Sequence, residues 1–306
     1  MYALISGLVA ATHSPRMGRP LLQGVAGCAM ISGLVARWGA LLQERDNMNN
    51  LFDVSGKVAL VTGGSRGIGE MIAEGFVANG VRTYISARKA EACDATAERL
   101  SEQGECISIP ADLSTSEGIS MLVDAVKSRE EKLDILVNNA GATWGAPIEE
   151  FPEAAWDKVM DINVKSPFFL TQALLPMLEK ASKQDDPARI IMVGSIDGLG
   201  VNRMPTFSYG PSKAAVHHLT RTLASHLASR NITVNAIAPG PFPSKMMAHT
   251  LETMGEKIRN GVPLQRIGEP GDMAGAAISL TSKASSYGTG VVIPVDGGIT
   301  GAPSTL

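Results

Sequence analysis

The fold is decided by one glycine-rich stretch, Thr62-Gly63-Gly64-Ser65-Arg66-Gly67-Ile68-Gly69. It follows the apolar, β-branched run Val58–Thr62, which predicts a strand, and a helical pattern begins at once after it. In such a strand-to-helix turn, Gly63 allows the tight turn, Gly67 lets the backbone approach a pyrophosphate, and Gly69 lets helix and strand pack closely. The unpaired N–H groups of the helix N-terminus favour an anion there. The stretch therefore predicts a dinucleotide-binding turn.

The rest of the chain after Lys57 alternates short apolar runs with longer helical segments such as Ile68–Asn79 and Ala90–Gln103. Runs that are apolar on successive residues, as in Ile190–Val193, indicate strands buried on both faces of a parallel sheet. Because right-handed crossovers join parallel strands, we expect a doubly wound α/β fold, a sheet of about seven strands flanked by helices, as one domain over residues 48–306. The expected strands are Val58–Thr62, Arg82–Ala87, Cys106–Ala111, Leu133–Asn138, Arg189–Gly194, Thr233–Ala238 and Val291–Val295.

Composition is that of a soluble globular protein, with 306 residues, 44% hydrophobic and 19% charged residues, and a net charge of −3. This balance favours neither a nucleic acid nor a membrane as partner. The cysteines Cys28, Cys93 and Cys106 match neither a metal site nor a disulfide framework and fit a reduced compartment, so we expect no metal and buried thiols. The adjacent His217 and His218 are interpreted as surface or packing residues, not ligands.

Residues 1–47 differ from the rest because they hold no acidic residue before Glu44 and only three arginines up to Gln43. We favour an upstream stretch before a true start at Met48, or a disordered extension. A mitochondrial-type targeting peptide shares this composition and is the second interpretation. Membrane attachment ranks below both, because the apolar runs are short or weak for a span. We expect a cytoplasmic protein, or a mitochondrial one if residues 1–47 are a targeting segment.

The end of the second expected strand indicates which dinucleotide binds. Enzymes that bind NAD usually place an acid there, but this chain reads Ser86-Ala87-Arg88-Lys89. Arg88, with Arg66 of the glycine stretch, would pair with a 2′-phosphate, which predicts NADP. The alternative is that Arg88 and Lys89 are solvated charges at a helix start.

Tyr209 and Lys213 are four residues apart, so on a helix they share one face. A phenol with an ordinary pKa near 10 is a poor acid–base group, and a neighbouring ammonium or an oxidised nicotinamide would lower that pKa. Tyr209 would then exchange a proton with a carbonyl oxygen, which Ser195, at the end of the fifth strand, would hold. Taken alone, the Tyr–Lys pair is commonly a surface pair and the serine a cap.

In combination, these motifs are similar to those of the short-chain dehydrogenase/reductase family, and the resemblance extends from Phe52 to Gly298. It implies a fold built on a Rossmann-type sheet. The matching positions are Thr62–Gly69, Asp112, Asn138-Asn139-Ala140-Gly141, Asn163, Ser195, Tyr209 with Lys213, and Pro239-Gly240.

The resemblance implies a role for each matching position. Asn163 would sustain a water-linked proton path to Lys213, which would also hold the nicotinamide ribose. Asp112 would bind the adenine amino group, and Ser244 stands where a threonine is usual. The expected catalytic residues are Asn163, Ser195, Tyr209 and Lys213. The expected cofactor contacts are Gly63, Ser65, Arg66, Gly67, Ile68, Gly69, Arg88, Asp112, Leu113, Asn139, Ala140, Gly141, Tyr209, Lys213, Pro239, Gly240 and Ser244.

The stretch from Pro241 to Pro263 holds many flexible apolar residues, which suits an acyl chain or only packs this segment on the domain. They are Phe242, Met246, Met247, Leu251, Met254, Ile258 and Val262. Trp144 is a second candidate wall.

Within the family the chain resembles the β-ketoacyl reductases associated with rhamnolipid and hydroxyalkanoate precursors, on Val58–Gly69, Ala140–Gly145 and Tyr209–Ala215. The resemblance implies an enzyme of fatty acid metabolism, a homotetramer that reduces a 3-oxoacyl thioester with NADPH. The alternatives are a polyol, sugar-acid or secondary-alcohol dehydrogenase and, from another class, a non-catalytic dinucleotide-binding scaffold, which the intact Ser195, Tyr209 and Lys213 disfavour.

Overall fold

The computed structural model describes residues 50–202, 204–244 and 247–301, so the extension predicted for residues 1–47 lies outside the described residues. Leu51–Leu306 forms one compact unit. Its centre is a sheet of seven parallel strands in the order β3-β2-β1-β4-β5-β6-β7. The predicted fold class is therefore confirmed. The strands are β1 Val58–Thr62, β2 Arg82–Ser86, β3 Cys106–Ser108, β4 Ile135–Asn138, β5 Ala188–Val193, β6 Ile232–Pro239 and β7 Val292–Val295.

Each strand lies where the sequence predicts it, with differences at the ends. The largest is in β3, which ends at Ser108 instead of Ala111. Backbone bonds to β2 continue from Ile109 and from Ala111 to the carbonyls of Ile85 and Ala87. Pro110 between them faces away from β2 at the open edge of the sheet, where its missing N–H costs no bond of the ladder. Hydrogen bonding to β2 thus extends beyond the last residue of β3.

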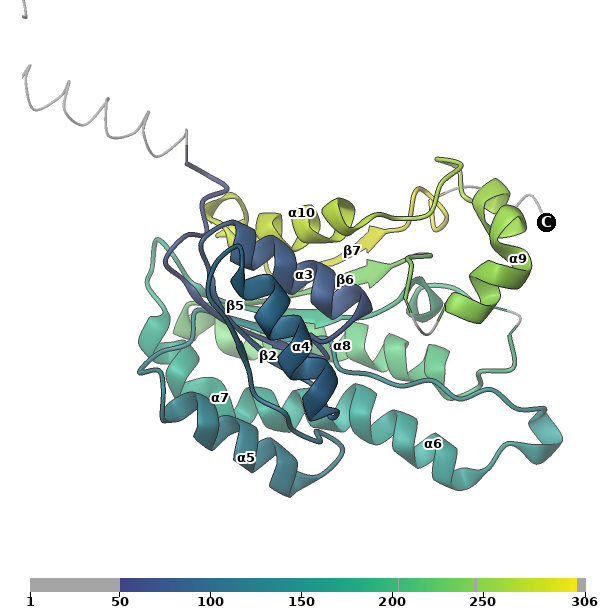
Figure 1. Ribbon diagram of the computed structural model, residues 1–306, viewed down its shortest axis with the longest axis horizontal. Helices are drawn as coiled ribbons and strands as arrows, with labels where there is room; N and C mark the ends of the chain where they lie inside the picture. Colours follow the sequence, from purple (N-terminus) through teal and green to yellow (C-terminus); the bar gives the residue numbers. More distant parts are fainter. Residues whose placement is uncertain (1–49, 203, 245–246, 302–306) are drawn as a thin grey trace, which may run out of the picture. The chain divides into compact units, whose positions relative to one another are not determined.

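Helices cover both faces of the sheet (Figure 1). One layer packs α3 (Gly67–Ala78), α4 (Ala90–Ser101) and α10 (Pro270–Thr281) on one face. The other layer packs α5 (Ser116–Lys127), α7 (Ser166–Ala181) and α8 (Tyr209–Leu227) on the opposite face. The remaining elements are α6 (Glu153–Met160), α9 (Ala248–Gly261), the π-helix η2 (Asp161–Lys165) and the 3₁₀ turns η1 (Ile148–Glu150), η3 (Ile196–Gly198), η4 (Ala228–Arg230) and η5 (Lys283–Ser285).

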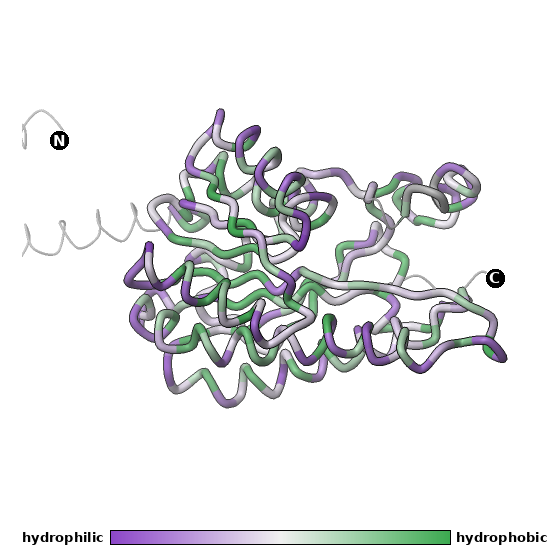
Figure 2. Tube along the Cα trace, turned by 60° about the horizontal axis from the view of Figure 1, so that its bottom comes forward, coloured by the Kyte–Doolittle hydropathy of each residue, from purple (hydrophilic) through white to green (hydrophobic). Residues whose placement is uncertain are grey.

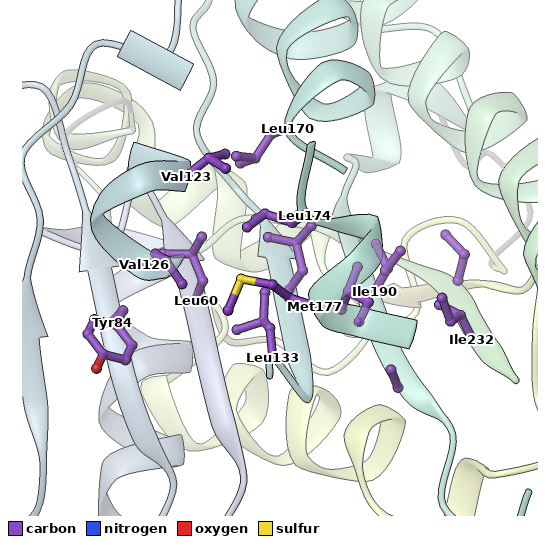
Figure 3. Close-up of a cluster of buried hydrophobic side chains, with 14 of the residues drawn as sticks. Leu60, Tyr84, Val123, Val126, Leu133, Leu170, Leu174, Met177, Ile190 and Ile232 are labelled. Carbon is purple, nitrogen blue, oxygen red and sulfur yellow. The ribbon is translucent and has the colours of Figure 1, made fainter. Parts of the chain in front are cut away.

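The core consists of two hydrophobic clusters, one on each face of the sheet. Figure 3 shows the first, where Val126 of α5 lies beside Leu60 of β1 and Val123 lies beside Leu170 of α7. Figure 2 shows that the central strands are hydrophobic along their length. Because burial on both faces removes apolar surface from water, it stabilises these strands and explains their continuous apolar sequence.

The strand order reverses at β1, which lies between β2 and β4. In open parallel sheets, ligands bind in the crevice outside the carboxyl ends of the strands at such a switch point. The loop after β1 carries the glycine stretch, and the loop after β4 carries Asn139. The fold thus brings both motifs to one crevice. Among the residues that the structure describes, no helix has the length and apolar character needed to cross a membrane.

Candidate functional site

The glycine turn between β1 and α3 has the backbone that its sequence predicts. Gly63 (φ 65°) and Gly67 (φ 59°) both adopt the left-handed region, which disfavours other residues. A Cβ atom at Gly69 would lie 2.8 Å from the carbonyl carbon of Gly63, so helix and turn approach closely only because this side chain is absent. A Cβ at Gly67 would lie 3.2 Å from the Cβ of Ser244. Ser244, in the segment after β6, therefore borders the glycine turn.

Thr62 and Asn139 fasten this turn to the loop after β4. The Thr62 hydroxyl donates to the Val137 carbonyl (3.1 Å) and accepts from the backbone N–H groups of Asn139 (2.9 Å) and Ala140 (3.0 Å). The Asn139 side-chain amide donates to the Thr62 carbonyl (2.8 Å). The motif Thr62–Gly69 marked this residue, but its role in joining the two loops appears only in the structure.

Arg88 and Asp112 come together at the ends of β2 and β3. The Asp112 carboxylate accepts bonds from the hydroxyl (2.7 Å) and the N–H (3.1 Å) of Ser114. These hydrogen bonds and the nearby positive charge of Arg88 lower the pKa of Asp112. Arg66 and Arg88 are both exposed. Leu113, in contrast, is buried in the core, so its side chain is engaged in packing.

The predicted catalytic side chains converge at the carboxyl end of β5. Tyr209 begins α8 and Lys213 follows one turn later, with its Nζ 5.6 Å from the centroid of the Tyr209 ring. The Lys213 ammonium donates to the Val193 carbonyl at 2.8 Å. The Ser195 hydroxyl accepts from the Asp197 N–H at 3.1 Å and lies near enough to Tyr209 to lower the pKa of its phenol. The helical spacing and the end of the strand therefore bring these three groups together as expected.

Burial is the main influence on the pKa of Tyr209. Burial and the charge of Asp197, against the lowering effect of the Ser195 hydroxyl, raise this pKa to about 12. Burial also lowers the pKa of Lys213 to about 8. Removal from water thus favours the neutral form of both groups. The prediction that Lys213 and an oxidised nicotinamide lower the pKa of Tyr209 stays a prediction.

Asn163 lies in the π-helix η2, where its side chain ties three segments together. Its Oδ1 accepts from the Ala142 N–H (2.8 Å), and its Nδ2 donates to the Ala142 carbonyl (3.0 Å) and to the Ser212 hydroxyl (2.9 Å). A Cβ at Gly141 would lie 3.0 Å from Asn163 Oδ1 and 3.6 Å from Lys213 Nζ. Both polar atoms therefore border the same small space at Gly141, and the predicted proton path remains a prediction.

His217 supports the turn that carries Ser195. The side chain is 2% exposed, whereas His218 is exposed, so the two neighbours point in different directions as expected. A Cβ at Gly194 would overlap with the His217 ring, and a Cβ at Gly198 would lie 2.8 Å from it. The imidazole thus fills the inner side of the turn around Ser195. Burial lowers the pKa of His217, so the ring is neutral at pH 7.

The loop after β6 closes the site on the side of β7. Gly240 donates its N–H to the Val295 carbonyl at 2.9 Å, and a Cβ there would lie 2.7 Å from the Cα of Asp296. Glycine is therefore required after Pro239 for this close approach. A cavity of about 520 Å³ lies beyond this loop. Its walls come from Pro241, Phe242, Pro263, Leu264, Arg266, Gly268, Asp272, Pro294, Val295, Asp296, Gly297 and Gly298, not from Ser195 or Tyr209.

The apolar stretch from Pro241 to Pro263 has two kinds of residue. Phe242 and Val262, near its ends, are buried in the body of the domain, so for them the packing interpretation holds. Met254 on α9 remains exposed. The side chains of Met246 and Leu251 lie outside the described part of the chain.

Cys93 and Cys106 are buried free thiols, as expected, and Cys28 lies outside the described residues. Across residues 50–202, 204–244 and 247–301, no group of three or more His, Cys, Asp or Glu side chains is arranged to hold a metal ion.

Known proteins share this arrangement over most of the chain. A family model described as enoyl-(acyl carrier protein) reductase matches residues 63–300. The chain is 49% identical to the rhamnolipids biosynthesis 3-oxoacyl-[acyl-carrier-protein] reductase of Pseudomonas aeruginosa, over 82% of this chain and 99% of that protein. It is 37% identical to a 2-dehydro-3-deoxy-D-gluconate 5-dehydrogenase of Dickeya dadantii, over 81% and 97%.

Solved structures are also similar to this chain over most of its length. The active-site complex of RhlG from P. aeruginosa with NADP covers 82% of this chain and 98% of its own, with 48% identity and a TM-score of 0.80. A gluconate 5-dehydrogenase from Burkholderia cenocepacia, solved with NADP and tartrate, covers 83% and 99%, with 29% identity and a TM-score of 0.76. With the glycine turn, the strand order and the Ser195–Tyr209–Lys213 cluster already in place, these matches show that the chain belongs to the short-chain dehydrogenase/reductase family.

Proposed function

We propose that the protein is an NADPH-dependent carbonyl reductase that converts a 3-oxoacyl thioester into the 3-hydroxyacyl thioester. The observation that carries this proposal is the convergence of Ser195, Tyr209 and Lys213 beside the glycine turn. The relative with 49% identity is named a 3-oxoacyl reductase, and the RhlG structure holds NADP, which supports both the substrate class and the cofactor. A cytoplasmic homotetramer is part of this proposal.

The residues of the crevice fit NADPH. The N-terminus of α3, opened by the left-handed Gly67, suits the pyrophosphate, and exposed Arg66 and Arg88 suit a 2′-phosphate. Asp112 and Asn139 border the same crevice from β3 and β4, and Pro239 and Gly240 border it from β6. When bound, the reduced nicotinamide supplies the hydride.

The proton is supplied by Tyr209. Burial keeps the Tyr209 phenol protonated at pH 7 in the protein alone, and the Lys213 ammonium beside it would lower its pKa toward the working range for transfer. Because the Ser195 hydroxyl lies near Tyr209, a carbonyl oxygen that accepts a hydrogen bond from Tyr209 would also be within reach of Ser195. The positive form of Lys213 stabilises the phenolate that remains after transfer.

A sugar-acid dehydrogenase is the second candidate, because several relatives at 33–37% identity are named as gluconate enzymes. The two candidates share the cofactor and the Ser–Tyr–Lys chemistry. They differ in the group that must be bound beside the carbonyl, which is apolar in one case and hydroxylated in the other.

NADPH oxidation with acetoacetyl and longer 3-oxoacyl thioesters, compared with 5-keto-D-gluconate, tests the proposal. We expect turnover of the thioesters, and a loss of about 10²- to 10⁴-fold in kcat for Tyr209→Phe. Turnover of 5-keto-D-gluconate alone would favour the second candidate. Full activity of Tyr209→Phe would contradict the assigned acid.

A further inference from the structure

An apolar surface at the mouth of the site has no role in the steps above. It consists of Trp144, Ile148, Met204 and Phe207, all exposed, and we call it the apolar platform. Exposed hydrophobic groups that gather on one surface commonly mark a binding site. The platform comes from two separate loops, the one after β4 and the one before α8.

Printed contacts join these two loops into one surface. The Ala146 N–H donates to the Pro205 carbonyl at 3.1 Å. The ring of Phe207 meets the ring of Phe151 edge to face, with centroids 5.7 Å apart, which fixes the Phe207 side of the platform. The aromatic side chains are therefore held in place from both loops.

The platform continues directly into the proposed catalytic centre. Tyr209 donates its N–H to the Thr206 carbonyl at 3.0 Å, and Thr206 lies between the platform residues Met204 and Phe207 in the chain. The loop before α6 and the helix α9 project from the same end of the domain (Figure 1). A substrate whose carbonyl meets Tyr209 would thus have one arm over the platform.

Charge favours one arm of a 3-oxoacyl thioester there. Among the described residues that follow Ile148 in the chain, Glu149, Glu150 and Glu153 expose carboxylates, and Lys158 places its ammonium 5.7 Å from the Trp144 ring. The thioester arm carries phosphate in its common carriers, so these carboxylates disfavour it. The acyl arm is neutral and apolar.

We infer that the apolar platform binds the distal acyl chain of the substrate and sets a preference for long chains. This inference rests on the proposed function. Each methylene that leaves water for an apolar surface improves binding by up to about fourfold. The kcat/KM of the wild-type protein should therefore rise with chain length from four to ten carbons.

The test uses paired variants with matched controls. Trp144→Ala/Phe207→Ala removes two platform rings, and Trp156→Ala/Phe169→Ala removes two rings of similar exposure elsewhere, since Trp144 and Trp156 are both 41% exposed and Phe207 and Phe169 are 39% and 44% exposed. We expect the platform variant to lower the ratio of kcat/KM for the ten-carbon to the four-carbon substrate at least tenfold. The control should keep that ratio within twofold.

A second readout does not need turnover. Calorimetric binding of decanoyl-pantetheine should weaken at least tenfold in the platform variant and remain unchanged in the control, while NADPH binding confirms that both variants are folded.

An unchanged chain-length ratio and unchanged binding would overturn the inference, and so would equal losses for all chain lengths. If light scattering showed a change of assembly alone, the surface would be a contact between copies. Absence of thioester turnover in the wild type would instead contradict the proposed function, with the binding measurement still deciding the platform.

Discussion

The glycine turn and the catalytic helix α8 meet in one crevice, but they are stabilised in opposite ways. In the turn, polar groups of Thr62 and Asn139 satisfy one another, and Gly69 allows backbone to pack against backbone. In α8, Lys213 and His217 are buried, and burial shifts the pKa of both toward the neutral form. The turn is a region of complementary packing, whereas the helix retains groups that cost stability because the chemistry needs them.

The largest expected effect concerns the buried ammonium of Lys213. Because its pKa falls from 10.5 in the unfolded chain to about 8 in the folded protein, folding releases a proton between these pH values. The free energy of unfolding therefore rises with pH across this window, by about 3 kcal/mol from this group. The variant Lys213→Met lacks this pH-dependent contribution to the free energy of unfolding.

Urea unfolding of Lys213→Met and wild type from pH 7 to 10.5 measures this contribution. The stability of the variant relative to wild type should fall by about 3 kcal/mol over that range. Exposed Lys180→Met is the control for losing a lysine. A difference that does not change with pH would show that burial of the ammonium is not costly, and the contrast between turn and helix would weaken.

A smaller effect is expected from His217→Ala, because the ring fills the inner side of the Ser195 turn without touching the proposed substrate position. Misplacement of Ser195 should lower kcat roughly 10- to 100-fold. NADPH affinity should not change, since the glycine turn is separate. His218→Ala, on the same helix but exposed, is the control. Equal kinetics of the two variants would remove His217 as a positioning residue.

The smallest effect is expected at the turn itself. Gly69 and Gly275 are both helical, and helix propensity alone predicts that alanine stabilises each by about 0.5–1 kcal/mol. A Cβ at Gly275 meets nothing within 4 Å, but at Gly69 it meets the Gly63 backbone. We expect Gly69→Ala to lower the free energy of unfolding by about 1–3 kcal/mol and Gly275→Ala to raise it, as measured by urea unfolding. Stabilisation by Gly69→Ala would contradict the close packing of the turn.

Much of the fold could be predicted from sequence because it depends on local patterns. Short β-branched and apolar runs indicated the seven strands, and the spacing of Tyr209 and Lys213 indicated one helix face. The ends of elements were less accessible, as β3 shows, because they depend on how regularly a strand pairs with its neighbour.

Other features of the site could not be predicted, because they depend on residues far apart in the chain. The side chain of Leu113 is buried in the hydrophobic core, and its predicted contact with a cofactor stays a prediction. Thr62 joins β1 to the loop after β4 across 77 residues. No local pattern encodes such a pair.

The sequence by itself determined the parallel α/β fold, the glycine turn and the presence of a Ser–Tyr–Lys set, since each follows from periodicity or from residue type at fixed spacing. Only the tertiary structure decided the protonation preferences of Tyr209 and Lys213, the role of His217 and the assembly of the apolar platform. The physical reason is that desolvation and packing depend on every element that surrounds a group. A pKa or a contact surface is therefore a property of the folded neighbourhood and not of the residue.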